Sequence, residues 1–228
     1  FSTQNEGVYL LKNSLLQNHL LSNDLVRVIL MCDNVPYVLI PHELFTEDKA
    51  QELFHFAFSE KVRDEIVFDT LKNSDAVLLY PFSTHVRELF ASFATVKKYH
   101  LAGVFADLML LIHKRSEKEP LVALHHKGGS LDIVAVKGRR LLFSNSFKVE
   151  SEDDVLYFVL YVYEHLRYNP EKTHLFVYGQ VAVDDSLSVL LKKYISHVFY
   201  TDTFGFFKMS SALELLPPHS YFVLMNAM

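Results

Sequence analysis

Three short apolar runs joined by glycine-containing turns constrain the fold of this chain most strongly. Leu121–Leu124, Leu131–Val136 and Arg140–Phe143 are rich in residues that favour strands, and Gly128-Gly129 and Lys137-Gly138 separate them. Glycine adopts the positive φ values that tight hairpin turns need, so short strands joined in this way are typical of an antiparallel meander. The sequence therefore predicts a three-stranded antiparallel sheet at the start of the second half.

Helices and strands alternate after this meander. Ser151 and Asp154 form a capping-box pattern ahead of a helix that Asn169-Pro170 ends. We then expect a strand at His174–Tyr178 and a helix capped by Asp184. A strand at Val198–Tyr200 and a short helix with a second capping box, formed by Ser211 and Glu214, follow. The order βββαβα, with a further strand and helix behind it, resembles the ribonuclease-H-like unit.

The first half has a similar but less regular order of elements. These are strands at Arg27–Cys32 and Tyr37–Ile40, a helix capped by Thr46, strands at Glu65–Leu71 and Ala76–Tyr80, a helix after Ser83, a strand at Thr95–Tyr99 and a helix over Leu101–Ile112. A charged segment that ends at Pro120 separates the halves. We therefore expect an α/β protein of two domains, residues 1–116 and 117–228, each a ribonuclease-H-like subdomain with a mixed sheet flanked by helices.

Composition and charge exclude several classes of protein. Lys and Arg total 22 against 27 Asp and Glu, a net charge of −5, and the basic residues are scattered, so we expect no nucleic-acid binding. The most apolar stretches are too short for a membrane span. The single cysteine, Cys32, excludes an internal disulfide and fits the reducing cytoplasm, where we place the protein. Because the sequence starts at Phe1 and not at Met, we expect residues upstream of it.

The segment LHHKGGSLDIV, residues 124–134, is the most informative about function. It resembles the second phosphate loop of the actin, Hsp70 and hexokinase superfamily, in which a strand ending in aspartate precedes a glycine-rich turn with serine or threonine. His125 stands where the superfamily has the aspartate that positions magnesium or the attacking water. The resemblance implies these phosphate-contacting candidates: Lys127, Gly128, Gly129 and Ser130. Lys127 either contacts a phosphate or lies in solvent, and the two glycines would also suffice for a hairpin turn.

A second resemblance lies at Gly179. The run LFVYGQ, residues 175–180, resembles the superfamily's adenosine motif, a strand that ends in Gly-Gly ahead of a helix. Gln180 replaces the second glycine, and we expect its side chain to occupy space that the superfamily gives to the nucleotide. The first phosphate loop, an Asp-x-Gly near the amino terminus, is not visible. Gly179 is therefore the adenosine-contacting candidate.

Three further runs of residues indicate a particular family within this superfamily. NSF at 145–147, EDDVLY at 152–157 and IPHELF at 40–45 are similar to runs in a domain-of-unknown-function family from Bacteroidetes whose members have an actin-like ATPase fold. The resemblance covers most of the chain and implies that fold, without an established activity. Cytoplasmic scaffold proteins of type IV pilus and type II secretion machines share the fold and are analogies only.

Three functional hypotheses follow. The leading one is a cytoplasmic protein acting as a non-catalytic or nucleotide-sensing scaffold, with no catalytic residue and no cofactor, because His125 and Gln180 replace motif residues. The alternative is an active ATPase or small-molecule kinase that binds ATP and Mg²⁺ through Lys127, Gly128, Gly129, Ser130 and Gly179. A metal-dependent hydrolase built on the histidines ranks last, because His125 and its neighbour point to opposite faces of a strand. We assign no metal ligand.

Aromatic residues are frequent, with 19 Phe and 12 Tyr, and several gather near the carboxyl end. We expect the following either to pack in a core or to stay exposed as an interface: Phe199, Tyr200, Phe204, Phe206, Phe207, Tyr221 and Phe222. The exposed alternative implies a protein partner or a homo-oligomer.

Overall fold

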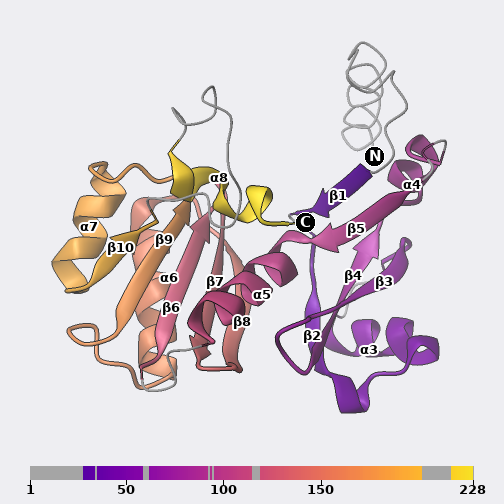
Figure 1. Cartoon of the computed structure of the whole chain (residues 1–228), viewed down its shortest axis with the longest axis horizontal. Coiled ribbons are helices and arrows are strands. Elements are labelled where there is room, and N and C mark those ends of the chain that lie inside the picture. Colours follow the sequence, from indigo (N-terminus) through magenta and orange to yellow (C-terminus); the bar gives the residue numbers. More distant parts are fainter. Residues whose placement is uncertain are drawn as a thin grey trace, which may run out of the picture. The chain divides into compact units, whose positions relative to one another are not determined.

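The computed structural model describes residues 28–33, 35–58, 62–91, 93, 95–114, 119–201 and 217–227, which form two compact units (Figure 1). The first unit contains the described residues up to Thr70 and Ala76–His100, and the second contains Leu71–Asp75 and the described residues from Leu101 onward. The main boundary between the two compact units thus follows His100, whereas the sequence predicts a domain boundary between residues 116 and 117. The reason is that helix α5 (Leu101–His113) packs against strands β7 and β8 of the second unit.

The second unit is built on a five-stranded mixed sheet in the order β10-β9-β6-β7-β8. Its strands are β6 (Leu121–His126), β7 (Ser130–Lys137), β8 (Arg140–Lys148), β9 (His174–Gly179) and β10 (Val198–Tyr200). Strands β6, β7 and β8 form the predicted antiparallel meander, while β9 runs parallel to β6 and β10 parallel to β9. The glycine-containing turns therefore lie where the sequence predicts them.

The helices of the second unit begin largely as the sequence predicts. Helix α6 (Glu152–His165) has a complete capping box, in which the Ser151 side chain accepts from the Asp154 backbone and the Asp154 carboxylate accepts from the Ser151 backbone. Helix α7 (Ser186–Tyr194) is capped by Asp185 and not by Asp184, so that prediction is wrong by one residue. Helix α8 (Pro218–Met225) follows, and the predicted cap at Ser211 and Glu214 lies outside the described residues.

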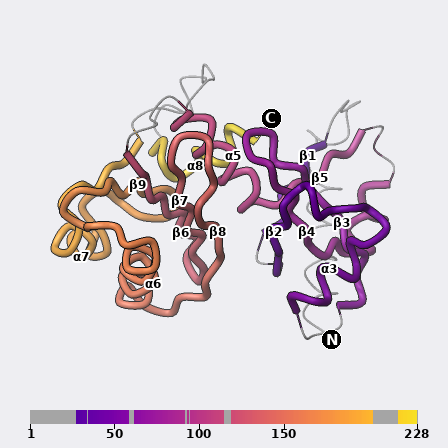
Figure 2. The backbone as a smooth tube through the Cα atoms, turned by 90° about the horizontal axis from the view of Figure 1, so that it is seen from below, coloured from indigo at the N-terminus to yellow at the C-terminus, as the bar shows by residue number. Residues whose placement is uncertain are grey.

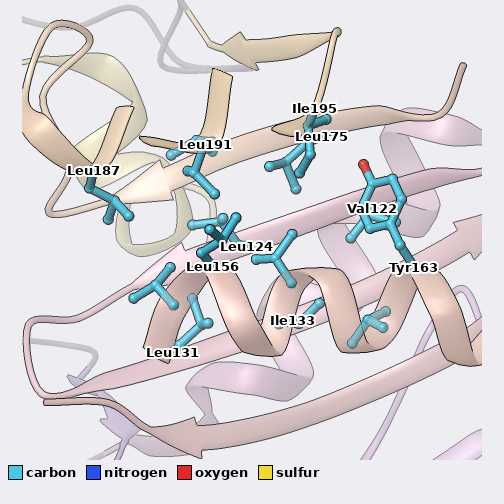
Figure 3. Packing of buried hydrophobic residues seen from close by; sticks show 14 of the residues in the cluster. Val122, Leu124, Leu131, Ile133, Leu156, Tyr163, Leu175, Leu187, Leu191 and Ile195 are labelled. Carbon is cyan, nitrogen blue, oxygen red and sulfur yellow. The ribbon is translucent and has the colours of Figure 1, made fainter. Parts of the chain in front are cut away.

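The core of the second unit lies between the sheet and helices α6 and α7. Figure 3 shows Leu124 of β6 beside Leu156 of α6, and Ile133 of β7 and Leu187 and Leu191 of α7 belong to the same buried cluster. Each such side chain, once buried, stabilises the unit by about 1.5–3 kcal/mol. Helices α5 and α8 cover the opposite face of the sheet (Figure 2). Both faces are covered, which accounts for the continuous apolar runs of β6 and β7.

Asp107, a charged residue in the apolar helix α5, has a structural role. Asp107 accepts backbone hydrogen bonds from Lys72 at 2.7 Å and Asn73 at 3.0 Å, which hold the turn 71–75 on the second unit. Burial raises the pKa of Asp107, and these hydrogen bonds oppose the rise. No helix in the described part of the chain combines the length and the apolar character needed to cross a membrane.

The first unit contains two small sheets. An antiparallel sheet in the order β2-β4-β3 is formed by β2 (Val38–Pro41), β3 (Glu65–Thr70) and β4 (Ala76–Phe82), and a parallel pair by β1 (Val28–Cys32) and β5 (Val96–His100). Helix α3 (Ala50–Ala57) buries Ala50 and Phe54 against the antiparallel sheet, and helix α4 (Thr84–Leu89) follows β4. Two 3₁₀ turns, η1 (His42–Leu44) and η2 (Glu47–Lys49), precede α3.

The predicted cap of α3 is wrong. Thr46 lies before the 3₁₀ turn η2, and its side chain makes no capping hydrogen bond. Its carbonyl accepts from the Lys49 backbone N–H and closes this turn, so the α-helix begins only at Ala50. Of the apolar positions at helical spacing in α3, Ala50 and Phe54 are buried and Leu53 is half-buried, whereas Ala57 is exposed.

Candidate functional site

The candidate phosphate loop is a two-residue hairpin turn between β6 and β7. The Lys127 backbone N–H donates to the Ser130 carbonyl at 2.9 Å, which leaves Gly128 and Gly129 as the central residues. Gly128 has φ +80°, whereas Gly129 does not have a positive φ. A positive φ at the first central residue alone is the pattern of a type II′ turn. Gly128 is therefore required by the turn, while a Cβ on Gly129 would meet nothing within 4 Å.

Gly179, the adenosine-contacting candidate, is required by the backbone around it. It has φ +91°, and a Cβ built on it would lie 2.0 Å from the His126 carbonyl oxygen. The next residue, Gln180, donates its backbone N–H to the same oxygen at 2.8 Å, and the His126 imidazole Nδ1 donates to the Gln180 carbonyl at 3.0 Å. The ends of β6 and β9 are thus joined at Gly179, which gives this glycine a structural role independent of any ligand.

A buried polar cluster lies beside the turn, on the sheet face covered by α5. Its centre is Asp132 of β7, which is fully buried and paired in register with His125 of β6 and Ser146 of β8. The Lys127 Nζ lies 3.1 Å from Asp132 Oδ1 and 2.9 Å from Oδ2, and the Ser146 hydroxyl donates to Oδ1. The Phe105 ring of α5 lies 5.5 Å from the His125 ring and covers it. We name these four residues, His125, Lys127, Asp132 and Ser146, the Asp132 cluster.

The charges in the Asp132 cluster compensate one another. Burial alone would raise the pKa of Asp132, but the His125 imidazole, the Lys127 ammonium and the Ser146 hydroxyl hold it below its ordinary value. The Lys127 side chain is only 9% exposed, and His125 Nδ1 is 3.8 Å from Asp132 Oδ2. The ammonium of Lys127 is thus paired with an internal carboxylate and does not lie in solvent, one of the two positions that the sequence left open. Its contact with a phosphate stays a prediction.

The hollow next to the turn is acidic. It has a volume of about 290 Å³ and is lined by His126, Gly128, Gln180 and three carboxylate residues, Glu150, Glu152 and Asp185. The described lining residues include no Lys or Arg. The Gln180 side chain reaches over the turn, since a Cβ on Gly128 would lie 3.3 Å from its Oε1. Carboxylates repel a polyphosphate, so this hollow is electrostatically unsuited to ATP.

The residues present do not fit a bound magnesium ion. The Asp132 carboxylate, next to the turn on the α5 face, is already paired with Lys127, and Mg²⁺ prefers several oxygen ligands. Within the described ranges, no three His, Cys, Asp or Glu residues are arranged to hold a metal ion. Of the five candidate site residues, Lys127, Gly128, Gly129 and Ser130 form the turn, and Gly179 lies at the adjoining strand end.

The aromatic residues of the carboxyl end divide between core and surface. Phe222 is 3% exposed and packs on Tyr178, whereas Phe199 and Tyr221 are 40% and 38% exposed. Tyr200 is half-buried and hydrogen-bonds with Ser188. The other members of the predicted set, Phe204, Phe206 and Phe207, lie outside the described residues.

A second titratable cluster, which the sequence does not reveal, lies in the first unit. Asp69 accepts hydrogen bonds from the His100 backbone N–H at 2.6 Å and from the Tyr80 hydroxyl at 3.2 Å. His100 is 1% exposed, and its ring contacts the rings of Tyr37 and Tyr80, with centroid distances of 4.8 Å and 5.2 Å. Burial raises the pKa of Asp69 to about 6, although these hydrogen bonds and Lys98 oppose the rise.

We expect the first unit to lose stability as the pH rises from about 4 to about 7. The folded state holds the Asp69 proton up to about pH 6, whereas an unfolded aspartate releases it near pH 3.9. The stabilising effect of the proton is therefore full below about pH 4 and is lost as the pH rises through about 6, by up to about 3 kcal/mol. Urea unfolding at pH 4.5 and 7.5 measures this difference. Asp69→Asn should remove most of the pH dependence of the unfolding free energy, whereas Asp75→Asn, at an exposed position, should leave it unchanged. If the unfolding free energy of Asp69→Asn depends on pH as strongly as that of the unaltered protein, Asp69 is not the group responsible.

Comparison with solved structures defines the fold class. A Bacteroides thetaiotaomicron VPI-5482 protein with actin-like ATPase fold and unknown function matches over 85% of this chain and 76% of that chain, at 23% identity and TM-score 0.75. A chain of the PilM–PilN type IV pilus biogenesis complex matches over 96% of this chain and 83% of that chain, at 13% identity and TM-score 0.58. This chain therefore has the actin-like ATPase fold, as predicted.

The family follows from the sequence match. The model of the family described as protein of unknown function (DUF3822) matches residues 1–198, and the chain belongs to this family. No curated protein matches the chain significantly. The expected membership of an unknown-function family with an actin-like ATPase fold is thereby confirmed.

Proposed function

We propose that this protein is a non-catalytic or nucleotide-sensing scaffold of the cytoplasm that kept the actin-like ATPase fold without its hydrolytic chemistry. The observation that carries the proposal is the pairing of the Lys127 ammonium with both carboxylate oxygens of Asp132. The Lys127 ammonium neutralises the Asp132 carboxylate next to the turn, so neither group is available to a magnesium–phosphate complex. The acidic hollow around Gly128 adds repulsion of polyphosphates.

Partner binding is the function that we assign to the scaffold. The similar chain of the PilM–PilN complex belongs to a protein assembly, which supports a protein partner or a homo-oligomer for this chain as well. Exposed aromatic side chains such as Phe199 and Tyr221 support the same proposal, because aromatic residues are enriched in interfaces. The single cysteine supports a reducing compartment.

One observation favours the alternative, an active ATPase or small-molecule kinase. The backbone N–H groups of Gly128 and Gly129 are consecutive and donate no hydrogen bond to any residue that the structure describes. Consecutive N–H groups in a glycine turn form the kind of concavity that binds phosphate. The alternative therefore uses the turn, with Ser130 and Gly179 beside it, and needs Lys127 to leave Asp132.

Titration of the full chain with ATP and Mg²⁺ separates these functions. We expect no steady ATP hydrolysis. The absence of a binding heat at millimolar ATP supports a scaffold that does not bind nucleotide, and saturable binding without turnover supports nucleotide sensing. Gly129→Leu is the matched variant, because a side chain at Gly129 enters open space and obstructs the turn without disturbing the fold. Steady ATP hydrolysis that Gly129→Leu abolishes would overturn the proposal in favour of the ATPase.

A further inference from the structure

The first unit contains a hollow that combines apolar walls with two cationic side chains. It has a volume of about 300 Å³, at the lower end of the roughly 300–1,000 Å³ typical of ligand pockets. Leu30 of β1, Phe82 of β4, Val96 of β5 and Phe93 form apolar walls, and Arg87 of α4 and Lys98 of β5 add positive charge. Val96 and Lys98 lie two residues apart on one strand, so their side chains share a face.

The two cations of this hollow meet over one aromatic ring. The Lys98 Nζ lies 5.1 Å and the Arg87 Cζ 5.8 Å from the centroid of the Phe82 ring. Such contacts attract each cation to the face of the ring.

The partners of the two cations differ. Arg87 forms an ion pair with Glu65, and both side chains are about half exposed. The Lys98 side chain makes no ion pair or hydrogen bond with any residue in the described ranges. It is near enough to lower the pKa of Asp69, yet the Asp69 oxygens accept from His100 and Tyr80 and not from Lys98. The half-buried ammonium of Lys98 therefore faces an apolar hollow without a hydrogen-bonded anion.

We propose that this hollow binds a small carboxylate with an apolar tail. The carboxylate contacts Lys98, and the tail packs on Phe93, Val96 and Leu30. A charge-assisted hydrogen bond in partly desolvated surroundings is stronger than one in water, and burial of the tail adds hydrophobic stabilisation. The hollow belongs to the first unit and the glycine turn to the second, so this proposal does not depend on the nucleotide question.

A carboxylate with an apolar group has two sources, a free aliphatic acid or the carboxyl end of a peptide with an apolar last residue. Both present the same chemistry to Lys98. Octanoate is the probe for the first source and N-acetyl-phenylalanyl-leucine for the second. We expect saturable binding of at least one probe to the full chain, measured by ligand-observed NMR and by calorimetry. The tighter of the two identifies the source.

Charge and shape controls separate specific binding from adsorption to apolar surface. Octylamine and octan-1-ol have the same tail without the carboxylate and should bind at least about tenfold more weakly than octanoate. Lys98→Met keeps the apolar stem and should weaken binding of the carboxylate probe about tenfold or more. Lys97→Met is the matched control on the same strand, because Lys97 is exposed and points to the opposite face, and it should change nothing.

A second variant tests the position of the tail independently of charge. Ala91 is an exposed lining residue, so Ala91→Phe should fill the hollow, leave the fold intact and abolish binding of both probes. Circular dichroism of each variant confirms folding before the titrations are compared. The proposal is overturned if neither probe binds at millimolar concentration, if octylamine binds as tightly as octanoate, or if Lys98→Met binds the carboxylate as tightly as the unaltered protein.

Discussion

Replacing Gly179 with alanine should destabilise the second unit by at least about 3 kcal/mol. An alanine at φ +91° costs about 1–2 kcal/mol by itself, because a Cβ is disfavoured in left-handed backbone. The added Cβ would also lie 2.0 Å from the His126 oxygen and 2.9 Å from His126 N and C, all of them backbone atoms. Strands β6 and β9 would have to separate at this point to admit the methyl group. Urea unfolding followed by far-ultraviolet circular dichroism measures the loss.

Gly129→Ala is the matched control for this prediction. Gly129 has no positive φ, and a Cβ there would meet nothing within 4 Å, so the free energy of unfolding should change by less than about 0.5 kcal/mol. The two glycines belong to the two sequence motifs that resemble nucleotide contacts, yet the structure requires only Gly179 for folding. Equal losses in Gly179→Ala and Gly129→Ala would show that the close approach of Gly179 to His126 is not as described.

The sequence predicts the second unit well because its signals are local. A hairpin turn of two glycines, a capping box at Ser151 and helical spacing each depend on residues only a few positions apart. The wrong cap at Asp184 shows the limit of such signals: two adjacent aspartates are equivalent in sequence, and only the chain path lets Asp185 accept from Ser188.

The role of Lys127 was within reach of the sequence. A two-residue turn at Gly128 and Gly129 places Lys127 opposite Ser130 and His125 opposite Asp132. Lys127 is then diagonal to Asp132 on the same face, a distance that a long side chain spans. The hairpin turn that the two glycines allow therefore predicts the pairing of Lys127 with Asp132 once this register is followed.

The Asp69 cluster, by contrast, depends on contacts between distant segments. Its partners are 11 and 31 residues away in sequence and come from strands of two different sheets. The sequence contains no pattern that brings Asp69 to the His100 backbone. The hollow beside Lys98 has the same origin, because β1, β4, α4 and β5 meet there only in the folded chain.

Lys127→Met should destabilise the second unit by about 3–5 kcal/mol, the usual cost of removing one partner of a buried ion pair. The change leaves the fully buried Asp132 carboxylate with only His125 and Ser146 nearby. Lys137→Met, at the exposed end of β7, is the matched control and should stay within about 0.5 kcal/mol. Urea unfolding at neutral pH measures both variants.

A double-mutant cycle tests whether the destabilisation comes from the ion pair. Asp132→Asn should also destabilise, because it leaves the Lys127 ammonium buried to 9% exposure without its counter-charge. The double variant Lys127→Met/Asp132→Asn contains no uncompensated charge and should lose less than the sum of the two single variants. Additive losses would contradict a direct interaction between Lys127 and Asp132.

The pH dependence of the Lys127→Met effect follows from the pKa of Asp132. That pKa lies below its ordinary value in the folded protein, so the ion pair stabilises the fold at neutral pH and loses this effect as the pH falls below about 4 toward the folded-state pKa. Without Lys127, the pKa of Asp132 should rise, because burial then dominates. The difference in unfolding free energy between the unaltered protein and Lys127→Met should therefore shrink steadily as the pH is lowered from 6 to about 3. A difference that stays constant over this range would show that Lys127 stabilises the unit through its apolar stem and not through its charge.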